Sequence, residues 1–457
     1  MTPVEELISQ YRDDGIQRVK LGVTDIDGVL RGKYLSLDKF AAIADSTSGF
    51  CDCVLGWDVD DQLYDNASYT GWHTAFPDVL YRIDLSSERR LLDENGTPYF
   101  IGEFVSADGE SLHPLCPRAR LKSVLAEAAK MGFKVNLAFE YEFFVFDETP
   151  HSVREKNYRN LKPLTPGNFG YSVLRTNTHA ELFHELMDFC IDHNFPLEGL
   201  HCETGPGVWE GALAVDSALN SADKASLFKT FVKSFFQRRE MIATFMAKWS
   251  MDYPGQSGHC HQSLVDLNTG ESRFFDARAE WQMSDIQKQY VAGQQKYMKS
   301  FLAMTSPTIN SYTRLVKGAW APTAATWGIE NRTTALRVIP GSAKSQRVEF
   351  RVGSADANPY LVASAVVAAG LQGIKDQLEL AAPVQGNAYD IQDDLPEAWQ
   401  LPGNLRDANR SFVQSKVARD WFGNEFVEHF SASRDWEVRE YEKSVTDWQL
   451  QRYFEVI

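Results

Sequence analysis

The most regular pattern of apolar and polar positions in this chain lies at residues 135–146, where the two kinds alternate. Aromatic and β-branched residues with a period of two predict a β-strand. One face of that strand would carry Val135, Leu137, Phe139, Tyr141, Phe143 and Val145, and the other Asn136, Ala138, Glu140, Glu142, Phe144 and Phe146. Two neighbouring carboxylates among aromatic rings repel each other and lose solvation. Either that face is open to water, as in an ordinary half-exposed strand, or a cation neutralises the pair.

The first third of the chain has the pattern of a small β-rich unit. Residues 4–14 predict a short amphipathic helix, and residues 19–23 alternate like a strand. Asp27-Gly28 is a hairpin signal, which predicts a second strand over residues 29–35. Residues 78–105 predict further short strands separated by turns.

The chain beyond Pro114 and Pro117 is dominated by helical spacing. Because two prolines interrupt regular structure, we predict two domains, 1–112 and 113–457. Helical patterns lie at Leu121–Ala128, at 179–193, at Leu227–Phe245 and, opened by the N-cap Asn358 and by Pro359, at 359–373. The long polar stretch 148–170 is unusual inside a compact domain, and we interpret it as a candidate flap.

Composition limits the function classes. A chain of 457 residues can bury a large core, and its length alone suggests two or three domains. Its 62 acidic and 46 basic residues give a formal net charge of −16, which argues against nucleic acid or an anionic membrane surface as the main partner. No apolar run reaches the roughly 18 residues of a membrane span, and no secretory signal is evident. Six cysteines without a CxxC motif form no disulfide framework, so we expect a reducing, cytoplasmic location.

Three further groups of residues carry candidate chemistry. They are the glutamates Glu198, Glu203 and Glu210, the segment Gly258-His259-Cys260-His261, and the bank of Arg314, Arg332, Arg337, Lys344, Arg347, Glu349 and Arg351. Carboxylates with an imidazole suit hard cations such as Mg²⁺ or Mn²⁺, and arginines suit phosphate and carboxylate oxygens. Phosphoryl transfer from a nucleotide needs both, although no P-loop or G-x-G-x-x-G motif occurs. Ordinary core histidines, surface ion pairs and solvated loop glutamates remain the simpler interpretation of each group taken alone.

Several motifs in one order make the chain resemble the glutamine synthetase family, of the prokaryotic type I kind, over nearly its full length. They are Phe139–Phe143, His201–Glu210, Ala243–Lys248, Gly258–His261, Asn310–Val316, Asn331-Arg332, Arg347–Arg351, Asn358–Leu361 and the tail from Asp447 to Phe454. The resemblance implies an α+β fold, with a small N-terminal β-grasp-like domain and a large catalytic domain built on a curved antiparallel sheet. It also implies a homo-oligomer, a dodecamer of two stacked hexameric rings with active sites shared between neighbouring subunits.

Matched motif by motif, the resemblance implies roles for individual residues. One divalent cation, Mg²⁺ or Mn²⁺, would be held by Glu142, Glu203 and Glu210, and a second by Glu140, His259 and Glu349. ATP would contact Glu198, His261, Ser263, Lys344 and Arg347, with Arg332 and Arg337 at its phosphates. The acid substrate would lie at Arg314, Arg351 and Gly255. The family reaction makes γ-glutamyl phosphate from glutamate and ATP, and an amine then attacks it.

Two departures from the family pattern bear on the substrates. In the family, the proton of the amine passes to an acidic residue in the loop that here contains Asp58, together with a glutamate just before Ala-Pro. Asp58 is present, but Trp320 stands at the glutamate position. An indole there favours an apolar substituent or a cation–π contact over ammonium. The segment around Gly255 also lacks the Asn-Gly that touches the amino group of glutamate in the family.

We therefore predict an ATP- and Mg²⁺-dependent ligase that joins the γ-carboxyl of glutamate to an organic amine, whether alkyl, aryl or polyamine. One alternative is a glutamine synthetase that uses ammonia, with Trp320 as packing filler in a shifted loop. The other is a non-catalytic family member with a structural or regulatory role, and the intact metal and arginine positions argue against it.

Overall fold

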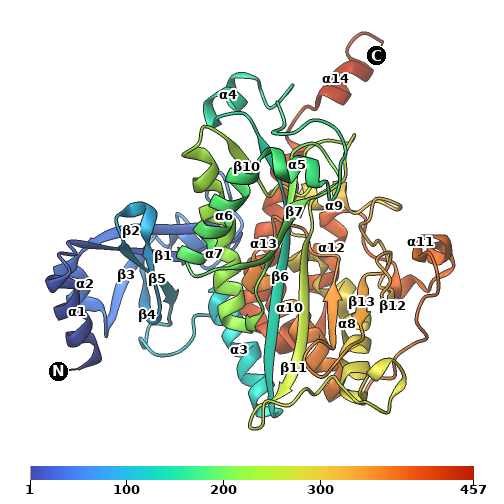
Figure 1. The fold of residues 1–457 in the computed structure, drawn as a ribbon, viewed down its shortest axis with the longest axis horizontal. Helices are drawn as coiled ribbons and strands as arrows, with labels where there is room; N and C mark the ends of the chain where they lie inside the picture. Colours follow the sequence, from blue (N-terminus) through green and yellow to red (C-terminus); the bar gives the residue numbers. More distant parts are fainter. Residues whose placement is uncertain (1, 457) are drawn as a thin grey trace.

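The computed structural model describes residues 2–456, which form two β-sheets with their own helices (Figure 1). The smaller sheet has five strands in the order β2-β1-β5-β4-β3. They are β1 (Arg18–Thr24), β2 (Leu30–Ser36), β3 (Thr47–Cys51), β4 (Asp78–Leu91) and β5 (Thr97–Phe104). Helices α1 (Pro3–Asp13) and α2 (Leu37–Ile43) share one buried apolar core with this sheet.

The sequence predicted most of this smaller unit. The first helix and the hairpin at Asp27-Gly28 are confirmed, since β1 and β2 pair antiparallel and Gly28 has a φ of +87°, a region that glycine adopts without strain. Strands separated by a turn over 78–105 are confirmed as β4 and β5, but the expectation that all of them are short is wrong. β4 is one strand of 14 residues that bends at an irregularity between Asp84 and Arg89, and the polar residues at this bend hide its continuity in the sequence.

The larger sheet has nine strands, and β6 (Phe133–Phe146) lies at its centre. The order is β12-β13-β14-β11-β6-β8-β7, and the short strands β9 and β10 also pair with β6. The bounds are β7 (Leu197–Cys202), β8 (Val208–Leu213), β9 (Asp216–Ser217), β10 (Ile242–Thr244), β11 (Gly258–Asp266), β12 (Trp327–Ile329), β13 (Leu336–Ile339) and β14 (Arg347–Phe350). Apart from the parallel pair β12–β13, these neighbours run antiparallel. The expected α+β fold is confirmed.

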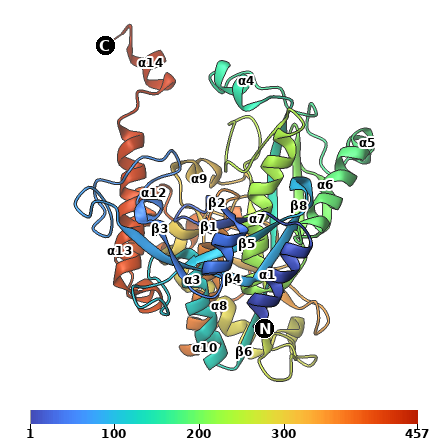
Figure 2. The same ribbon diagram turned by 90° about the vertical axis from the view of Figure 1, so that its left-hand side faces the viewer.

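Helices close one face of the larger sheet and leave the other face for a site. α3 (Pro117–Lys130) and α7 (Ala218–Gln237) pack against β6, and α10 (Pro359–Lys375) and α8 (Asp285–Thr305) continue that layer (Figures 1 and 2). On β6, the alternate residues from Val135 to Val145 are buried in this core, whereas Glu140 and Glu142 are half-buried on the opposite face. The alternation read from the sequence is therefore confirmed.

One predicted helix and one predicted loop differ from the structure. α7 ends at Gln237, and Ile242, which continues its apolar spacing, instead pairs with Phe146 in β10. The exposed residue Glu240, with a φ of +58°, turns the chain between them. The stretch 148–170 contains a helix, α4 (Pro150–Glu155), which begins at a capping box between Thr149 and Ser152. The helices α6 (Ala180–Asp192) and α10, whose N-cap is Asn358, are as predicted.

The C-terminal part of the chain completes the helical layer. Its helices are α11 (Ala388–Ile391), α12 (Leu405–Val413), α13 (Lys416–Glu442) and α14 (Asp447–Tyr453). Two short helices earlier in the chain are α5 (Val173–Thr178) and α9 (Ile309–Arg314). α14 projects from the body of the molecule (Figure 1) and exposes Trp448, Leu450 and Phe454. Within residues 2–456, each helix is too short or too polar to cross a membrane. The domain boundary at residue 112 stays a prediction.

Candidate active site

Strand register on the open face of the larger sheet builds a first cluster of metal-binding side chains. β11 pairs with β6 so that His259 lies opposite Glu140, and β14 brings Glu349 opposite His261. The Nδ1 atom of His259 lies 3.2 Å from Oε1 of Glu140 and 3.3 Å from Oε1 of Glu349. Glu140, His259 and Glu349 can therefore offer ligand atoms to one cation, and this is the second metal set expected from the sequence.

A second cluster lies on β7, β8 and the turn between them. It consists of His201, Glu203 and Glu210, with Nε2 of His201 at 3.6 Å from Oε1 of Glu203 and 3.5 Å from Oε1 of Glu210. Glu142, expected in this set, lies opposite Glu210 in the β6–β8 register, and its Oε2 accepts a hydrogen bond of 2.6 Å from the backbone N–H of Ser257. The sequence analysis missed His201, although it lies two positions before Glu203 and so shares its face in an extended segment.

Both clusters hold carboxylates that are close together and partly removed from water, a setting that favours bound cations. Loss of hydration, reinforced by the charge of Glu140, raises the pKa of Glu210 above the ordinary carboxyl range. Burial opposes ionisation of Glu140 as well, but hydrogen bonds from His259 and His261 outweigh it and hold the pKa of Glu140 low. In the described structure, the buried Nε2 atom of His201, which faces Glu203 and Glu210, makes no hydrogen bond. A divalent cation in each cluster would satisfy the carboxylates, together with Nε2 of His201 in one cluster and Nδ1 of His259 in the other, so the residues present fit two cations.

A bank of arginines borders the clusters. Arg337 donates a 3.0 Å hydrogen bond to Oε2 of Glu349, and Arg351 donates to the other oxygen of that carboxylate. Arg314 is buried and donates to the backbone carbonyls of Arg351 and Val352, at 3.1 and 2.8 Å. Burial lowers the pKa of Arg314 to about 10, so it stays charged at neutral pH. Arg314 therefore fixes the backbone that carries Arg351.

Two cavities open on these residues. The first, of about 480 Å³, is lined by both clusters together with Glu142, Gly255, Arg314, Trp320, Arg332, Arg337 and Arg351. The second, of about 530 Å³, is lined by the set expected to contact ATP, which is Glu198, His261, Ser263, Lys344 and Arg347. Glu140, Arg332 and Arg337 line both. The cavities thus meet at the arginines expected to bind phosphate.

Gly255 and Trp320 form part of the wall of the first cavity. A Cβ atom at Gly255 would lie 2.6 Å from Cγ of Arg314 and 2.7 Å from the carbonyl oxygen of Ala247, so glycine is required there. Trp320 has a φ of +58° and is 63% exposed. An indole this exposed is poorly packed by its own chain, which argues against its being core filler. Tyr171 also lines the cavity and stacks on His201 with 4.5 Å between ring centroids.

Asp58 lies apart from both cavities, on the loop between β3 and β4. Its Oδ1 accepts hydrogen bonds of 2.9 Å from the backbone N–H groups of Asp60 and Gln62, and its Oδ2 accepts one of 2.8 Å from Nε1 of Trp436. Within one subunit, Asp58 therefore does not reach Trp320. Its predicted place in the amine pocket depends on a neighbouring subunit and stays a prediction.

Comparison with known proteins assigns the chain to a family. The family model of the glutamine synthetase catalytic domain matches residues 114–453. The chain belongs to the glutamine synthetase family. It is 43% identical over 459 residues to type-1 glutamine synthetase 2 of Dictyostelium discoideum, covering 100% of this chain and 87% of that protein. It is 34% identical over 444 residues to a glutamate–isopropylamine ligase of a Pseudomonas species, covering 97% and 96%.

A solved structure agrees with the family assignment. The GmaS/ADP complex matches with a TM-score of 0.85 and 27% identity, covering 98% of this chain and 99% of that one. As a member of the glutamine synthetase family, the chain is a carbon–nitrogen ligase of the ATP- and metal-dependent type. The two clusters and the arginine-lined cavities are the parts of this chain that suit such chemistry.

Proposed function

We propose that this protein is an ATP-dependent ligase that joins the γ-carboxyl of glutamate to an organic amine through γ-glutamyl phosphate. The observation that carries the proposal is Trp320, whose exposed indole lines the same cavity as Arg351 and both metal clusters. An indole offers an apolar face to the carbon substituent of an organic amine, and ammonium has no such substituent to bury. The similarity to a glutamate–isopropylamine ligase over 97% of the chain supports the same class of second substrate.

The first half of the reaction activates the acid. A carboxylate has a poor leaving group, so transfer of the γ-phosphoryl group of ATP to the glutamate carboxylate gives a mixed anhydride with a good one. Arg351, held in place by Arg314, would bind the acid, and Arg332 and Arg337 would stabilise charge on the transferring phosphoryl group. The two clusters would hold the Mg²⁺ or Mn²⁺ ions, two or more in number, which would supply positive charge to offset that of the phosphates.

The second half forms the amide. The amine nitrogen attacks the carbonyl carbon, phosphate leaves, and the amine loses a proton to a base. We assign that base to Asp58 of a neighbouring subunit, in a dodecamer of two hexameric rings. The apolar residues Trp448, Leu450 and Phe454, exposed on α14, are a surface that assembly would cover, which supports an oligomer.

The acyl phosphate must also be kept from water. The stretch 148–170 leads directly to Tyr171, whose ring covers His201 of the second cluster. The backbone N–H of Tyr171 donates a 2.7 Å hydrogen bond to the carbonyl of Cys202, which holds this segment over the site. The position supports the proposal that residues 148–170 act as a flap.

Glutamine synthesis from ammonia is the second candidate, and the 43% identity to a type-1 glutamine synthetase favours it. One assay separates the candidates: phosphate release from ATP and glutamate with ammonia, alkylamines, amino alcohols, diamines or arylamines. A higher kcat/KM for at least one amine than for ammonia supports the proposal, and ammonia above every amine supports glutamine synthetase. Failure to release phosphate with any of them would favour a non-catalytic role.

A further inference from the structure

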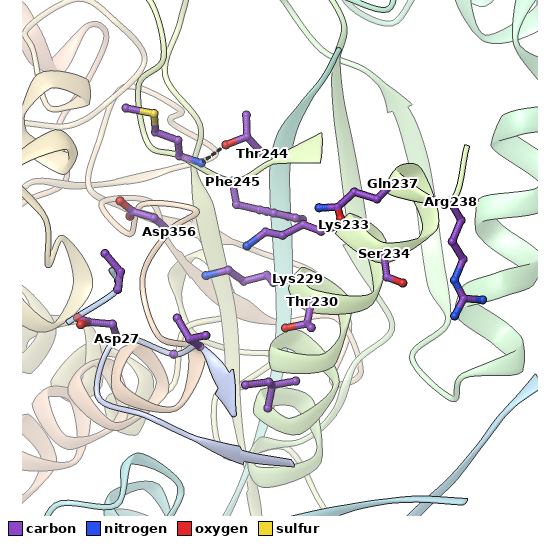
Figure 3. Close-up of a pocket in the computed structure, with 15 residues that line it drawn as sticks. Asp27, Lys229, Thr230, Lys233, Ser234, Gln237, Arg238, Thr244, Phe245 and Asp356 are labelled. Atoms are coloured by element: carbon purple, nitrogen blue, oxygen red, sulfur yellow. Dashed lines mark hydrogen bonds between the residues drawn. The ribbon is translucent and has the colours of Figure 1, made fainter. Parts of the chain in front are cut away.

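A third cavity, of about 780 Å³, lies behind the larger sheet, on the side covered by helices (Figure 3). It is open to solvent on one side and is lined by the turn between β1 and β2, by α7, by residues 244–246, and by Val59 and Asp356. Among the described residues, it shares no lining side chain with either active-site cavity. It is therefore a separate space, with chemistry of its own.

Two lysines of α7 extend into this cavity. Lys229 and Lys233 are four residues apart, so they project from one face of the helix, and in Figure 3 both side chains reach in the same direction. Lys229 is only 8% exposed, and its Nζ donates a single hydrogen bond of 2.8 Å, to the carbonyl oxygen of Ala357. A lysine ammonium has three donors, so two donors of Lys229 remain for a ligand or water.

The protein supplies no direct counterion to the pair. Within residues 2–456, neither ammonium has a carboxylate oxygen within 4.0 Å. Asp27, on the cavity wall, is already paired with Arg434. Asp356 accepts hydrogen bonds from the hydroxyls of Thr308, at 2.9 Å, and of Ser354. Asp27 is thus engaged elsewhere, whereas Asp356 keeps its negative charge and acts on both lysines from beyond 4.0 Å.

The charge on the lysines is correspondingly disfavoured. Loss of hydration, followed by the charge of Lys233, lowers the pKa of Lys229 to about 7. Lys233 stays open to solvent inside the cavity, yet the surrounding protein lowers its pKa as well. An anion placed between the two would offset both effects, because opposite charge favours the protonated form.

We propose that this cavity binds a small organic oxyanion, a carboxylate or a phosphate monoester, between the ammonium groups of Lys229 and Lys233. The hydroxyl-bearing residues Thr230 and Ser234 follow the lysines along the cavity wall and can donate to further oxygens. The apolar wall, which includes Leu30 and Phe245, suits the carbon part of such a ligand.

Differential acetylation of the full-length assembled protein tests the site. Labelling with trace acetic anhydride, followed by peptide mass spectrometry, gives the acetylation rate of each lysine separately. Phosphate bound by the active-site arginines therefore does not affect the rates measured for Lys229 and Lys233. With inorganic phosphate or malonate at about 10 mM, we expect acetylation of Lys229 and Lys233 to slow roughly threefold or more relative to chloride at equal ionic strength. Lys224 is the matched control, because it lies on the same helix but is paired with Asp216 at 2.7 Å, and its rate should not change.

Two results would overturn the proposal. One is an equal acetylation rate in phosphate, malonate and chloride. The other is complete protection of both lysines in every buffer, which would mean that a second copy of the chain covers the cavity.

A variant adds a second test. Lys233→Met removes one of the two charges, so phosphate should no longer protect Lys229, whereas Lys224→Met should leave the protection intact. Persistent protection in a Lys233→Met protein with wild-type melting temperature would also overturn the paired site. Should that variant fail to fold, the wild-type labelling still decides.

Discussion

Glu140 and His259, 119 positions apart in the chain, lie opposite each other on β6 and β11, with Oε1 and Nδ1 3.2 Å apart. An antiparallel register that runs from the Gly258–Tyr141 pair to the Asp266–Phe133 pair fixes their positions. Because side chains alternate across a strand, a slip of one residue would turn the carboxylate into the helix-covered core. The first cluster is therefore built by the pleat of the sheet.

Removal of one ligand from either cluster should stop ligation. Glu140→Ala and Glu203→Ala each take one carboxylate from a different cluster, so divalent binding weakens and the charge of the site is unbalanced. Both side chains are half-buried on the open face, so the fold should survive. Phosphate release at ordinary Mg²⁺ measures the effect, and size-exclusion chromatography checks assembly. Lys134→Ala, which changes an exposed residue of β6, is the control. Near-wild-type turnover in Glu140→Ala or Glu203→Ala would show that the replaced glutamate is not a metal ligand.

Arg332→Ala should depress formation of the acyl phosphate itself. Arg332 lines both active-site cavities, and an arginine facing phosphoryl oxygens stabilises charge in the transition state. Loss of one such donor costs about 10²-fold in rate or more. Hydroxylamine traps the intermediate as a hydroxamate without the natural amine, so it isolates this step. Arg273→Ala, exposed and distant from the cavities, should give a normal yield, whereas a normal yield from Arg332→Ala would place Arg332 outside the site.

Arg351→Ala should depress the same step, with a structural cost as well. Among the described residues, Arg351 is one of two arginine partners of Glu349, which is 1% exposed, and its removal leaves this buried carboxylate with Arg337 as its one arginine partner. The melting temperature must therefore be measured beside the hydroxamate yield. A loss of yield at full melting temperature would assign the effect to chemistry, and an unchanged yield would contradict the role in acid binding.

The joint between the N-terminal loops and the C-terminal helices should weaken in acid. His429 of α13 is buried and donates from Nε2 to the carbonyl of Leu55 at 2.6 Å, and His113 contacts the hydroxyl of Tyr69 at 2.6 Å. Burial lowers the pKa of both imidazoles to about 4. The folded protein keeps them neutral, whereas the unfolded chain takes up protons below about pH 6.5.

The free energy of unfolding should therefore fall as the pH drops from about 6.5 to 4, and these two groups should have no influence on its slope above that range. Urea midpoints over that range measure it. His429→Gln keeps a donor for Leu55 but does not titrate, so its slope should be smaller. His184→Gln, exposed on α6, should behave as wild type, and equal slopes in wild type and His429→Gln would contradict the assignment.

Local periodicity and motif order were enough to predict the parts of the site that one strand carries. The two faces of β6 follow from alternation, and His259 and His261 follow from the same rule on β11. The membership of the second cluster could not be predicted in this way. Glu142 lies opposite Glu210 through the pairing of β8 with β6, which joins residues far apart in the sequence, and His201 lies opposite Glu210 through the pairing of β7 with β8.

Other misses have the same physical origin. Ile242 keeps the apolar spacing of α7, but its backbone instead pairs with Phe146 of β6, and the sheet gives it a half-buried place that no helical pattern reveals. β4 reads as several strands because its polar bend breaks the alternation, while hydrogen bonds to β5 hold it together. Asp58 is a case in which even the folded chain is not enough, because its proposed role in the amine pocket needs a second subunit.

The choice of amine should depend on Trp320. Replacing the family's glutamate with an indole removes a charge that would bind and deprotonate ammonium, and adds an apolar face in the cavity of Arg351. A few methylenes buried against that face contribute about 0.8 kcal/mol each, so a small alkyl or aryl group gains roughly 10- to 100-fold in kcat/KM over ammonia.

Trp320→Glu should then lose activity with organic amines and gain some with ammonia, whereas Trp320→Phe, which keeps an apolar ring, should retain the preference of the wild type. Asp58→Asn should slow both amines and ammonia, because it removes the proposed proton acceptor without changing the apolar wall. The measurement is kcat/KM for ammonia and for a panel of amines in all four proteins. If the wild type prefers ammonia to every amine tried, the indole does not select the substrate, and the protein is a glutamine synthetase with an unusual loop.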